Sequence, residues 1–363
     1  MNKILTFFAV LTLFFSCKNE NKRSDSKLIK PIDSLKTEPQ RQTFGIVIHG
    51  GAGTIRKKKM TDSLEKAYRL KLEEAIKAGH TILKNGGTAL EAVTKTITVL
   101  EDSPLFNAGK GAVFTHDKTN ELDASIMDGA TLNAGAVAGV KRIKNPITLA
   151  LAVMNDSPHV FLYGEGAEAF AKQQGFEWVD NSYFFTEWRY KSIKKVLRKK
   201  KKKTNKKVAY ETLDNFQDPF INDSKFGTVG CVALDKNGNL AAGTSTGGMT
   251  NKRWNRIGDS PLIGAGTYAN NASCAISATG WGEYFIRGVI AHDISAMMEY
   301  KGVSIEEAAT EVIQNKLTKM GGTGGVIGID KDGNMTMQFN TKGMYRASMN
   351  ANGELKIAIF GND

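Results

Sequence analysis

The chain contains the stretch Gly227-Thr228-Val229-Gly230-Cys231-Val232-Ala233-Leu234, a run of small and β-branched residues headed by a threonine. The turn-like sequence Asp235-Lys236-Asn237-Gly238-Asn239 separates it from a second such run, Leu240–Thr244. β-Branched residues favour strands, and Asn-Gly between two such runs favours a tight turn. The stretch therefore predicts a β-hairpin whose first strand begins at Thr228.

Upstream of this hairpin, strand-like runs alternate with helical patterns. Leu64, Tyr68 and Leu72 recur at helical spacing, Asn85-Gly86-Gly87 ends that pattern, and Thr88 is placed to cap the next helix. The elements expected before residue 190 are strands at 44–48, 111–115, 124–128 and 134–140, helices at 64–83, 89–100, 146–154 and 165–174, and a flexible glycine loop at 49–53.

Downstream of the hairpin, the same alternation continues. Ser304, followed three residues later by Glu307, is the pattern of a capping box at the start of a helix. The expected elements are a strand at 273–278, helices at 284–300 and 304–317, and a hairpin of strands 325–330 and 334–339. Alternating groups of strands and helices predict a layered α/β sandwich.

A threonine at the head of a strand becomes a nucleophile if the chain is cut in front of it. Its hydroxyl is a weak nucleophile, but an N-terminal threonine carries its own base, the free α-amino group. That group has a pKa of roughly 7.7–8.0, which suits proton transfer near neutral pH. Gly227 leaves the bond in front of Thr228 without a bulky neighbour. Because Gly-Thr pairs are common at strand starts, this interpretation depends on other residues.

Three further groups supply what such a nucleophile needs. Thr246 lies in a hydroxyl-rich turn after the second strand of the hairpin. Arg256 and Asp259 can bind the α-carboxylate and the α-ammonium group of an amino acid. Further along, the Thr279 hydroxyl and the Gly280 N–H can donate hydrogen bonds to an oxyanion.

Together these residues resemble the plant-type L-asparaginase and isoaspartyl aminopeptidase family of N-terminal-nucleophile hydrolases. The resemblance covers about residues 44–346, and its motifs occur in the family's order. The matching motifs are Ile48-His49-Gly50-Gly51-Ala52-Gly53, Pro104-Leu105-Phe106-Asn107-Ala108-Gly109, Gly227-Thr228-Val229-Gly230, Thr244-Ser245-Thr246-Gly247-Gly248, Arg256-Ile257-Gly258-Asp259 and Gly321-Gly322-Thr323-Gly324-Gly325.

The resemblance implies a four-layer αββα sandwich and self-cleavage between Gly227 and Thr228. The products would be a large N-terminal subunit, residues 44–227, and a small C-terminal subunit, residues 228–363. The resemblance also implies a dimer of such cleaved pairs. Asn107 resembles the residue that assists self-cleavage.

By similarity, Thr228 attacks the side-chain amide carbonyl of the substrate and Thr246 supports it by hydrogen bonding. Arg256 and Asp259 would hold the α-groups of the substrate. Catalysis would need no cofactor. The remaining residues expected around the substrate are the oxyanion-hole pair Thr279 and Gly280, followed by Trp281 and Gly282.

Two aromatic positions depart from the family pattern. Trp281 stands where the family usually has a smaller residue, and Trp254-Asn255 precedes Arg256 where a glycine is usual. Both departures lie beside the expected pocket, so the preferred leaving group stays open.

The family's sodium-binding loop corresponds to residues 100–110 of this chain. The candidate sodium ligands are Leu100, Glu101, Ser103, Phe106, Ala108 and Lys110, mostly through backbone carbonyls.

The first residues resemble an export signal. Lys3 precedes the apolar run Ile4–Phe15, which is too short to span a bilayer comfortably, and Ser16-Cys17 follows. The pattern predicts a signal peptide at 1–16, lipidation of Cys17 and a flexible polar tether at 17–43, as in a lipoprotein anchored in a bacterial envelope or periplasm. An ordinary secretory signal is the alternative.

The net charge of +12 comes from one segment. Twelve Lys or Arg residues and no acidic residue lie between Arg189 and Lys207, so the rest of the chain is close to neutral. This distribution argues against nucleic acid as a partner. We interpret residues 190–227 as a mobile basic linker without a sustained apolar face.

The remaining histidines and cysteines give no metal pattern. Cys231 and Cys274 lie in apolar runs without histidines nearby, and the sequence does not decide whether they pair. His49 is interpreted as structural, because the α-amino group of Thr228 already provides the base.

The sequence therefore predicts a threonine hydrolase for a small amino-acid or dipeptide substrate, acting on β-linked aspartyl dipeptides and L-asparagine. One alternative is a glycosylasparaginase, which cleaves a sugar–asparagine amide. A more remote alternative is a surface lipoprotein that has lost catalysis and binds polyanions through Lys199–Lys203.

Overall fold

The computed structural model describes residues 43–203 and 227–361. These residues form two β-sheets. In the larger sheet the strands follow the order β12 (Leu355–Phe360), β11 (Gly343–Asn350), β1 (Gly45–Gly53), β5 (Val229–Leu234), β6 (Leu240–Thr246), β2 (Leu122–Asp128), β3 (Ala134–Val140) and β4 (Phe161–Tyr163). Neighbouring strands run antiparallel except for β3 and β4, which are parallel.

The smaller sheet packs against the larger one through an apolar layer. Its strands follow the order β10 (Met335–Phe339), β9 (Gly324–Asp330), β8 (Cys274–Gly280) and β7 (Thr267–Ala269). Val47 and Val232 of the larger sheet share one buried cluster with Ala275, Ile327 and Ile329 of the smaller sheet. Burial of this apolar surface holds the two sheets together.

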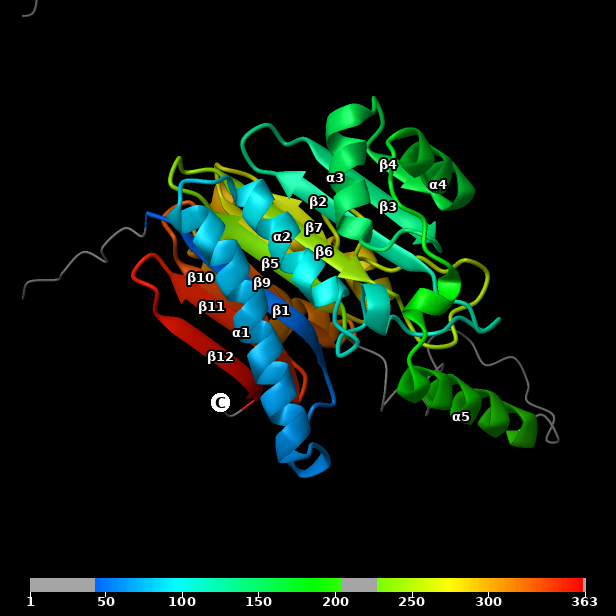
Figure 1. Ribbon diagram of the computed structural model, residues 1–363. Helices are drawn as coiled ribbons and strands as arrows, with labels where there is room; N and C mark the ends of the chain where they lie inside the picture. Colours follow the sequence, from blue (N-terminus) through cyan, green and yellow to red (C-terminus); the bar gives the residue numbers. More distant parts are fainter. Residues whose placement is uncertain (1–42, 204–226, 362–363) are drawn as a thin grey trace, which may run out of the picture. The chain divides into compact units, whose positions relative to one another are not determined.

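Helices cover the outer face of each sheet. On the larger sheet lie α1 (Asp62–Lys84), α2 (Ala89–Glu101) and α3 (Pro146–Asp156), whose apolar residues share a cluster with β1, β2 and β5 (Figure 1). On the smaller sheet lie α6 (Gly282–Gly288), α7 (Ile290–Lys301), α8 (Ile305–Thr310) and the following π-helical segment η5 (Glu311–Leu317). The order of layers is helix, sheet, sheet, helix, which confirms the predicted αββα sandwich.

Local sequence signals explain where several helices begin. The Thr61 side chain accepts a hydrogen bond from the Leu64 amide at the start of α1. Thr88 with Glu91 forms a capping box on α2, and Ser304 with Glu307 forms another on α8. These contacts satisfy amides that a helix leaves unpaired at its first turn. The predicted caps at Thr88 and Ser304 are confirmed.

Both predicted hairpins are present. Strands β5 and β6 pair from Val229 opposite Ser245 to Leu234 opposite Leu240. Asp235 closes their turn by accepting hydrogen bonds from the amides of Asn237 and Asn239, and Gly238 provides the positive φ of 82°. Strands β9 and β10 pair in the same way around a turn closed by Asp330. The head of β5 is therefore held in the centre of the larger sheet.

The basic linker prediction is wrong for residues 190–203, which belong to helix α5 (Glu187–Lys203). Arg189 and Ile193 are buried, four residues apart on this helix. This short buried face was missed because the lysines around it dominate the composition. The remainder of the predicted linker, residues 204–226, lies outside the described residues.

Three other element predictions need correction. The expected flexible loop at 49–53 is part of strand β1, where every residue is buried. The expected strand at 111–115 is a loop after η2 (Gly109–Gly111), because the Asn120 side chain donates to the carbonyls of Ala112 and Val113. The expected helix at 284–300 is two helices, α6 and α7, separated at Val289 with its positive φ of 50°.

Several elements had no sequence prediction. Strands β4, β7, β11 and β12 were missed, and so were the short helices η1 (Lys57–Lys59) and η3 (Asn181–Phe184). Helix α4 (Gly164–Gln173) matches its predicted range closely. Strand β11 matters most, because it pairs with β1 along the HGGAG motif, from Gly45 opposite Asn350 to Gly53 opposite Gly343.

The cysteines and the N-terminal predictions have different outcomes. Cys231 and Cys274 are both free and buried in strands β5 and β8, and burial raises the pKa of each thiol. The signal peptide, Cys17 and most of the tether lie outside the described residues. Within the described ranges, no helix has the length and hydrophobicity needed to cross a membrane.

Candidate active site

Thr228 lies at the head of β5 with its hydroxyl directed at another threonine. Its Oγ1 is 3.0 Å from the Oγ1 of Thr246, the last residue of β6. The amide of Gly248 donates to the same Thr246 oxygen at 3.0 Å. The hairpin thus brings together the predicted nucleophile and its predicted supporting hydroxyl, and the turn after β6 fixes the second of them.

His49 contacts the backbone of Thr228, the predicted nucleophile. Its Nδ1 is 3.0 Å from the Thr228 carbonyl oxygen and its Nε2 is 3.0 Å from Ser277 Oγ. Burial lowers the pKa of His49 to about 3, so the ring is neutral at ordinary pH. A carbonyl oxygen only accepts, so Nδ1 carries the proton and Nε2 accepts from Ser277. This geometry agrees with the structural role predicted for His49.

A chain of buried hydroxyls continues from Ser277. Ser277 Oγ lies 2.6 Å from Thr244 Oγ1, and Thr267 Oγ1 donates to Thr244 at 2.6 Å. Ser125 then reaches Thr267 at 2.8 Å. All of these side chains are buried, and connected buried networks hold their members in one arrangement. Sequence reasoning missed this network, because its members come from four separate strands.

Asn107 contacts Gly227, the residue in front of Thr228. Its backbone amide donates to the Gly227 carbonyl oxygen at 2.9 Å. Its side chain donates to the Gly248 carbonyl at 2.7 Å and accepts from the Val113 amide at 2.9 Å. The predicted self-cleavage residue therefore lies beside the bond in question.

Gly51 of strand β1 packs directly on the junction. A Cβ atom added to Gly51 would lie 2.4 Å from the Gly227 Cα, and Gly51 has a φ of 110°. Both facts require glycine at this position. The HGGAG motif thus allows β1 to approach Gly227 closely.

A small pocket opens beside Thr228. Its residues come from the head of β5, the end of β6, the loop that follows β6 and the end of β8. They are Thr228, Thr246, Gly248, Met249, Arg256, Gly258, Asp259, Ser260 and Gly280. The predicted nucleophile, its partner, both charged anchors and half of the predicted oxyanion pair therefore line one cavity.

Arg256 is held by a carboxylate that sequence reasoning did not pair with it. Its Nε and Nη2 donate to the two carboxylate oxygens of Glu283, each at 2.9 Å. Burial works to lower the pKa of Arg256, but the bonds to Glu283 and the nearby carboxylates outweigh it and raise the pKa. Glu283 lies in the first turn of helix α6, 27 residues further along the chain. The guanidinium is thus fixed at the pocket in a bidentate grip.

Asp259 is buried beside Arg256, and its Oδ2 makes no hydrogen bond to the described residues. Burial raises the pKa of Asp259 to about 7, and the charge of Arg256 opposes this. Gly282 makes room for both anchors, because an added Cβ would lie 2.7 Å from Asp259 Oδ1 and 2.8 Å from Arg256 Nη2. A buried carboxylate with an unused oxygen suits a cationic ligand group.

The predicted oxyanion residues stand at the end of β8. The Thr279 hydroxyl accepts from the Ala52 amide at 3.3 Å, which leaves its own hydrogen available for donation. Gly280 lines the pocket. Trp281 packs on Tyr284 with ring centroids 5.1 Å apart, and its amide donates to the Thr323 carbonyl at 2.9 Å. Trp254 is 92% exposed, with φ values of 53° at both Trp254 and Asn255.

A buried lysine beneath the pocket was also missed. Lys252 is 4% exposed, and its amine lies 3.7 Å from Glu121 Oε2 and 3.8 Å from Asp123 Oδ2. Asp123 pairs with Thr246 across β2 and β6. Lys252 also approaches Gly248, where an added Cβ would lie 3.2 Å from its amine. Its partners are more than a hundred residues away in sequence, so no local motif could reveal them.

The candidate sodium loop follows the C-terminus of α2. Glu101 is buried there, accepts hydrogen bonds from the Ser245 hydroxyl at 2.6 Å and the Ile147 amide at 3.1 Å, and keeps Oε2 without a partner among the described residues. Burial raises the pKa of Glu101 to about 8. The carbonyls of Glu101 and Phe106 lie close to Gly109 and Gly111, where an added Cβ would meet them at 2.3 and 2.0 Å.

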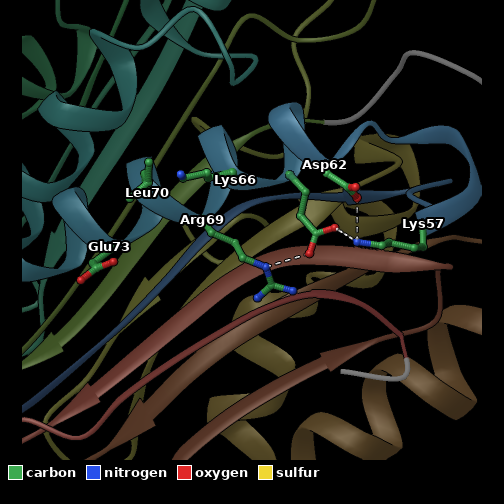
Figure 2. A pocket seen from close by; sticks show the side chains of 7 residues that line it. Lys57, Asp62, Lys66, Arg69, Leu70 and Glu73 are labelled. Carbon is green, nitrogen blue, oxygen red and sulfur yellow. Dashed lines mark hydrogen bonds and ion pairs between the residues drawn. The ribbon is translucent and has the colours of Figure 1, made fainter.

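A second groove lies along α1, away from these residues in sequence. Figure 2 shows Lys57, Asp62 and Arg69 among its lining side chains. Lys57 pairs with Asp62 at 3.5 Å and also with Glu65, and Glu65 accepts from Arg69 at 2.9 Å. Its charges neutralise one another, so we do not take this groove for the active site.

Comparison with known proteins agrees with this geometry. Residues 42–359 match the protein family described as "Asparaginase". The chain belongs to this family. The fold of the asparaginase family is that of N-terminal-nucleophile hydrolases, and its chemistry requires no cofactor.

Relatives in several organisms support the assignment to the asparaginase family. The isoaspartyl peptidase of Escherichia coli (strain K12) is 51% identical over 302 residues, which cover 83% of this chain and 91% of the relative. A putative isoaspartyl peptidase/L-asparaginase of Dictyostelium discoideum is 49% identical, and the match covers 83% of this chain and 92% of the relative. A probable isoaspartyl peptidase/L-asparaginase 2 of Arabidopsis thaliana is 41% identical, and the match covers 87% of this chain and 99% of the relative.

Proposed function

We propose that this chain is a self-cleaving threonine hydrolase that releases aspartate from β-linked aspartyl dipeptides and from L-asparagine. The observation that carries the proposal is the position of Thr228. Its hydroxyl lies 3.0 Å from Thr246 in a pocket that also contains the opposite charges Arg256 and Asp259. The names of the relatives favour the same activity.

Self-cleavage at Gly227–Thr228 would create the active nucleophile. The new α-amino group takes the proton of the Thr228 hydroxyl, whose oxygen then attacks the side-chain carbonyl of the substrate. Thr279 and Gly280 donate to the resulting oxyanion, and the ammonium group returns its proton to the leaving amine. Water then hydrolyses the aspartyl ester and regenerates Thr228.

The pocket supports a substrate with a free amino-acid head. Arg256 would bind the α-carboxylate and Asp259 the α-ammonium group, which places the β-carbonyl one methylene away, toward Thr228. An α-linked aspartyl peptide has no free α-carboxylate at its aspartate, so Arg256 would face an uncharged amide. Glycosylasparaginase, the alternative activity, gains no support from the relatives described above.

The first test follows cleavage of the chain. A denaturing gel of purified protein should show two bands, and N-terminal sequencing of the smaller band should begin at Thr228. Thr228→Ala should leave the chain whole. A wild-type chain that remains intact after prolonged incubation would refute the proposed mechanism.

The second test compares substrates at equal concentration by amine release. The cleaved enzyme should hydrolyse β-Asp-Leu and L-asparagine but not α-Asp-Leu. Because a lost charge-assisted contact amounts to about 1.5–3 kcal/mol, we expect discrimination of at least about tenfold. Comparable rates on the two dipeptides would contradict the proposed pocket, whatever happens to Thr228.

We also propose that the protein is exported, with residues 1–16 removed and a lipid on Cys17. The small residue before Cys17 and the short apolar run support this proposal. Metabolic labelling with a radioactive fatty acid should mark the wild type and not Cys17→Ser. The cleaved pairs are further proposed to form dimers, and light scattering of the purified enzyme tests this.

A structural sodium ion is proposed at the loop after α2. The carbonyl oxygens near Gly109 and Gly111 and the buried carboxyl of Glu101 fit a hard cation, which prefers oxygen ligands. Such an ion would stabilise the loop that carries Asn107 and would take no part in the reaction. Thermal unfolding should occur at a higher temperature in sodium chloride than in choline chloride; equal transitions would refute the site.

A further inference from the structure

Arg189 is a buried cation at the start of α5 that the proposed hydrolysis does not use. It is 5% exposed, and its guanidinium lies 3.7 Å above the Trp188 ring. Its Nε donates to the Gly111 carbonyl at 2.9 Å. Burial lowers the pKa of Arg189 to about 10, which still leaves it charged at neutral pH. A charge in such a place is costly unless something compensates for it.

No aspartate or glutamate of the described ranges lies within ion-pair distance of Arg189. Among the described residues, the titratable groups that interact electrostatically with Arg189 are the phenols of Tyr68 and Tyr345. Their rings stack with centroids 4.1 Å apart. Burial raises the pKa of both phenols, so both are neutral near pH 7. Within the described residues, the guanidinium therefore faces uncharged groups.

The guanidinium lies beside Gly227. A Cβ atom added to Gly227 would be 3.5 Å from Arg189 Nη2. Gly227 is itself buried, and its carbonyl oxygen accepts from the Asn107 amide. Arg189 also donates to Gly111, at the end of the loop that carries Asn107. The buried cation and the proposed self-cleavage residue thus both lie beside Gly227, and they come from different elements.

Self-cleavage would place negative charge on this carbonyl group. The Thr228 hydroxyl adds to the Gly227 carbonyl carbon, which gives an oxyanion. The C–N bond then breaks, and the hydroxyl proton ends on the Thr228 nitrogen, which leaves an ester. Water cleaves the ester and restores the Thr228 hydroxyl. Gly227 becomes a carboxylate, and the proton it releases converts the Thr228 amine to ammonium.

We propose that Arg189 is the counter-charge for the negative charge that self-cleavage develops on Gly227, first as the oxyanion and then as the carboxylate. This inference rests on the self-cleavage proposed above. A charge-assisted contact of this kind is stronger than a neutral hydrogen bond, and it forms only as the reaction proceeds. In this role Arg189 acts at Gly227, and it is not among the residues that line the pocket beside Thr228.

The test measures the rate at which newly made chains cleave. Each protein is synthesised in a cell-free reaction, and the uncleaved fraction is followed by gel and by intact mass. Arg189→Met should slow cleavage by about tenfold or more, because it removes a charge-assisted contact in the transition state. Arg189→Lys keeps the positive charge but loses the planar fork and the stacking on Trp188, so it should cleave faster than Arg189→Met and more slowly than the wild type.

Two controls separate charge from packing. Lys191→Met removes a positive charge from an exposed position of α5 and should cleave at the wild-type rate. Trp188→Leu removes the ring under the guanidinium but keeps the charge, and it should resemble Arg189→Lys.

Wild-type kinetics in Arg189→Met would overturn the proposal. Equal slowing in Arg189→Met, Arg189→Lys and Trp188→Leu would also overturn it, since it would show that Arg189 only packs. A wild-type chain that never cleaves would instead refute the proposed self-cleavage itself.

Discussion

In the proposed function, Arg256 would interact with two carboxylates during turnover: Glu283, which holds it in the structure, and the α-carboxylate of the substrate. The planar guanidinium has five donors, so it can serve both, whereas a lysine amine offers no fork. Arg256→Lys should lower kcat/KM for β-Asp-Leu by about tenfold or more, corresponding to roughly 1.5–3 kcal/mol.

The measurement uses fully cleaved enzyme and steady-state amine release. Arg287→Lys, an exposed exchange of the same kind on α6, is the matched control and should leave kcat/KM unchanged. Unchanged kinetics in cleaved Arg256→Lys would remove Arg256 from the binding site.

Asp259 should make substrate binding depend on pH. Its pKa is raised by burial to about 7, so the carboxylate needed by the substrate ammonium group is lost as the pH falls below about 7. The KM for β-Asp-Leu should therefore rise as the pH falls below about 7. Binding of L-aspartate, measured by calorimetry from pH 5 to 8, should weaken as the pH falls below about 7. The Asp259→Asn variant should bind L-aspartate weakly at every pH in this range. An identical pH trend in Asp259→Asn would assign it to another group.

The same raised pKa of Asp259 affects folding stability in the opposite direction, because a rise in pH favours substrate binding but lowers the free energy of unfolding. The folded chain holds a proton on Asp259 that the unfolded chain releases above a pKa of roughly 3.9. Between there and about pH 7 the folded state binds more protons, so this group makes the folded state less stable as the pH rises. Binding of a cationic substrate group to Asp259 offsets part of this loss.

At the level of elements, α5 has one end that matters for packing and another that we expect to be replaceable. Ile193 is fully buried, whereas Lys199–Lys203 are at the end of the helix. Replacing Lys199–Lys203 by Gly/Ser should leave turnover within about twofold, since the ends of such elements tolerate change. A large loss of turnover in properly cleaved protein would show that these lysines take part.

Ile193→Ala is the contrasting change in the same helix. Removing three buried carbons should destabilise the protein by roughly 2–4 kcal/mol through lost burial and an unfilled cavity. Thermal unfolding would show a lower transition temperature than in the wild type or the lysine replacement. An unchanged transition would mean that α5 contributes nothing to the stability of the domain.

The elements also show which parts of the molecule can be predicted from sequence. Helix caps and both hairpin turns were predictable, because residues within a few positions of one another determine them, as Ser304 and Glu307 do. Strand β11 was missed and the Glu283 partner of Arg256 was not recognised, since both depend on contacts between distant segments. Thr228, Thr246, Arg256 and Asp259 were found through motif resemblance, and the structure brings all of them to one pocket.

At the scale of the whole molecule, the two predicted cleavage products are interleaved. Strand β1, from the N-terminal part, lies between β5 and β11, both from the C-terminal part. Strand β2 likewise pairs with β6. After cleavage the fragments should therefore co-elute in size-exclusion chromatography and separate only on a denaturing gel. Separate elution under native conditions would contradict this arrangement.

The close contact of Gly51 with Gly227 has a consequence for making the enzyme in two pieces. If β1 and the segment ending at Gly227 dock on β5 without a covalent link, residues 44–227 and 228–363 can be encoded by separate genes. Co-expressed, with the initiator methionine removed from the second piece, they should assemble into a split enzyme that hydrolyses β-Asp-Leu. Expressed alone, each piece would expose strand edges and should aggregate. Fragment complementation would then supply the terminal threonine amine without cleavage of a Gly227–Thr228 bond.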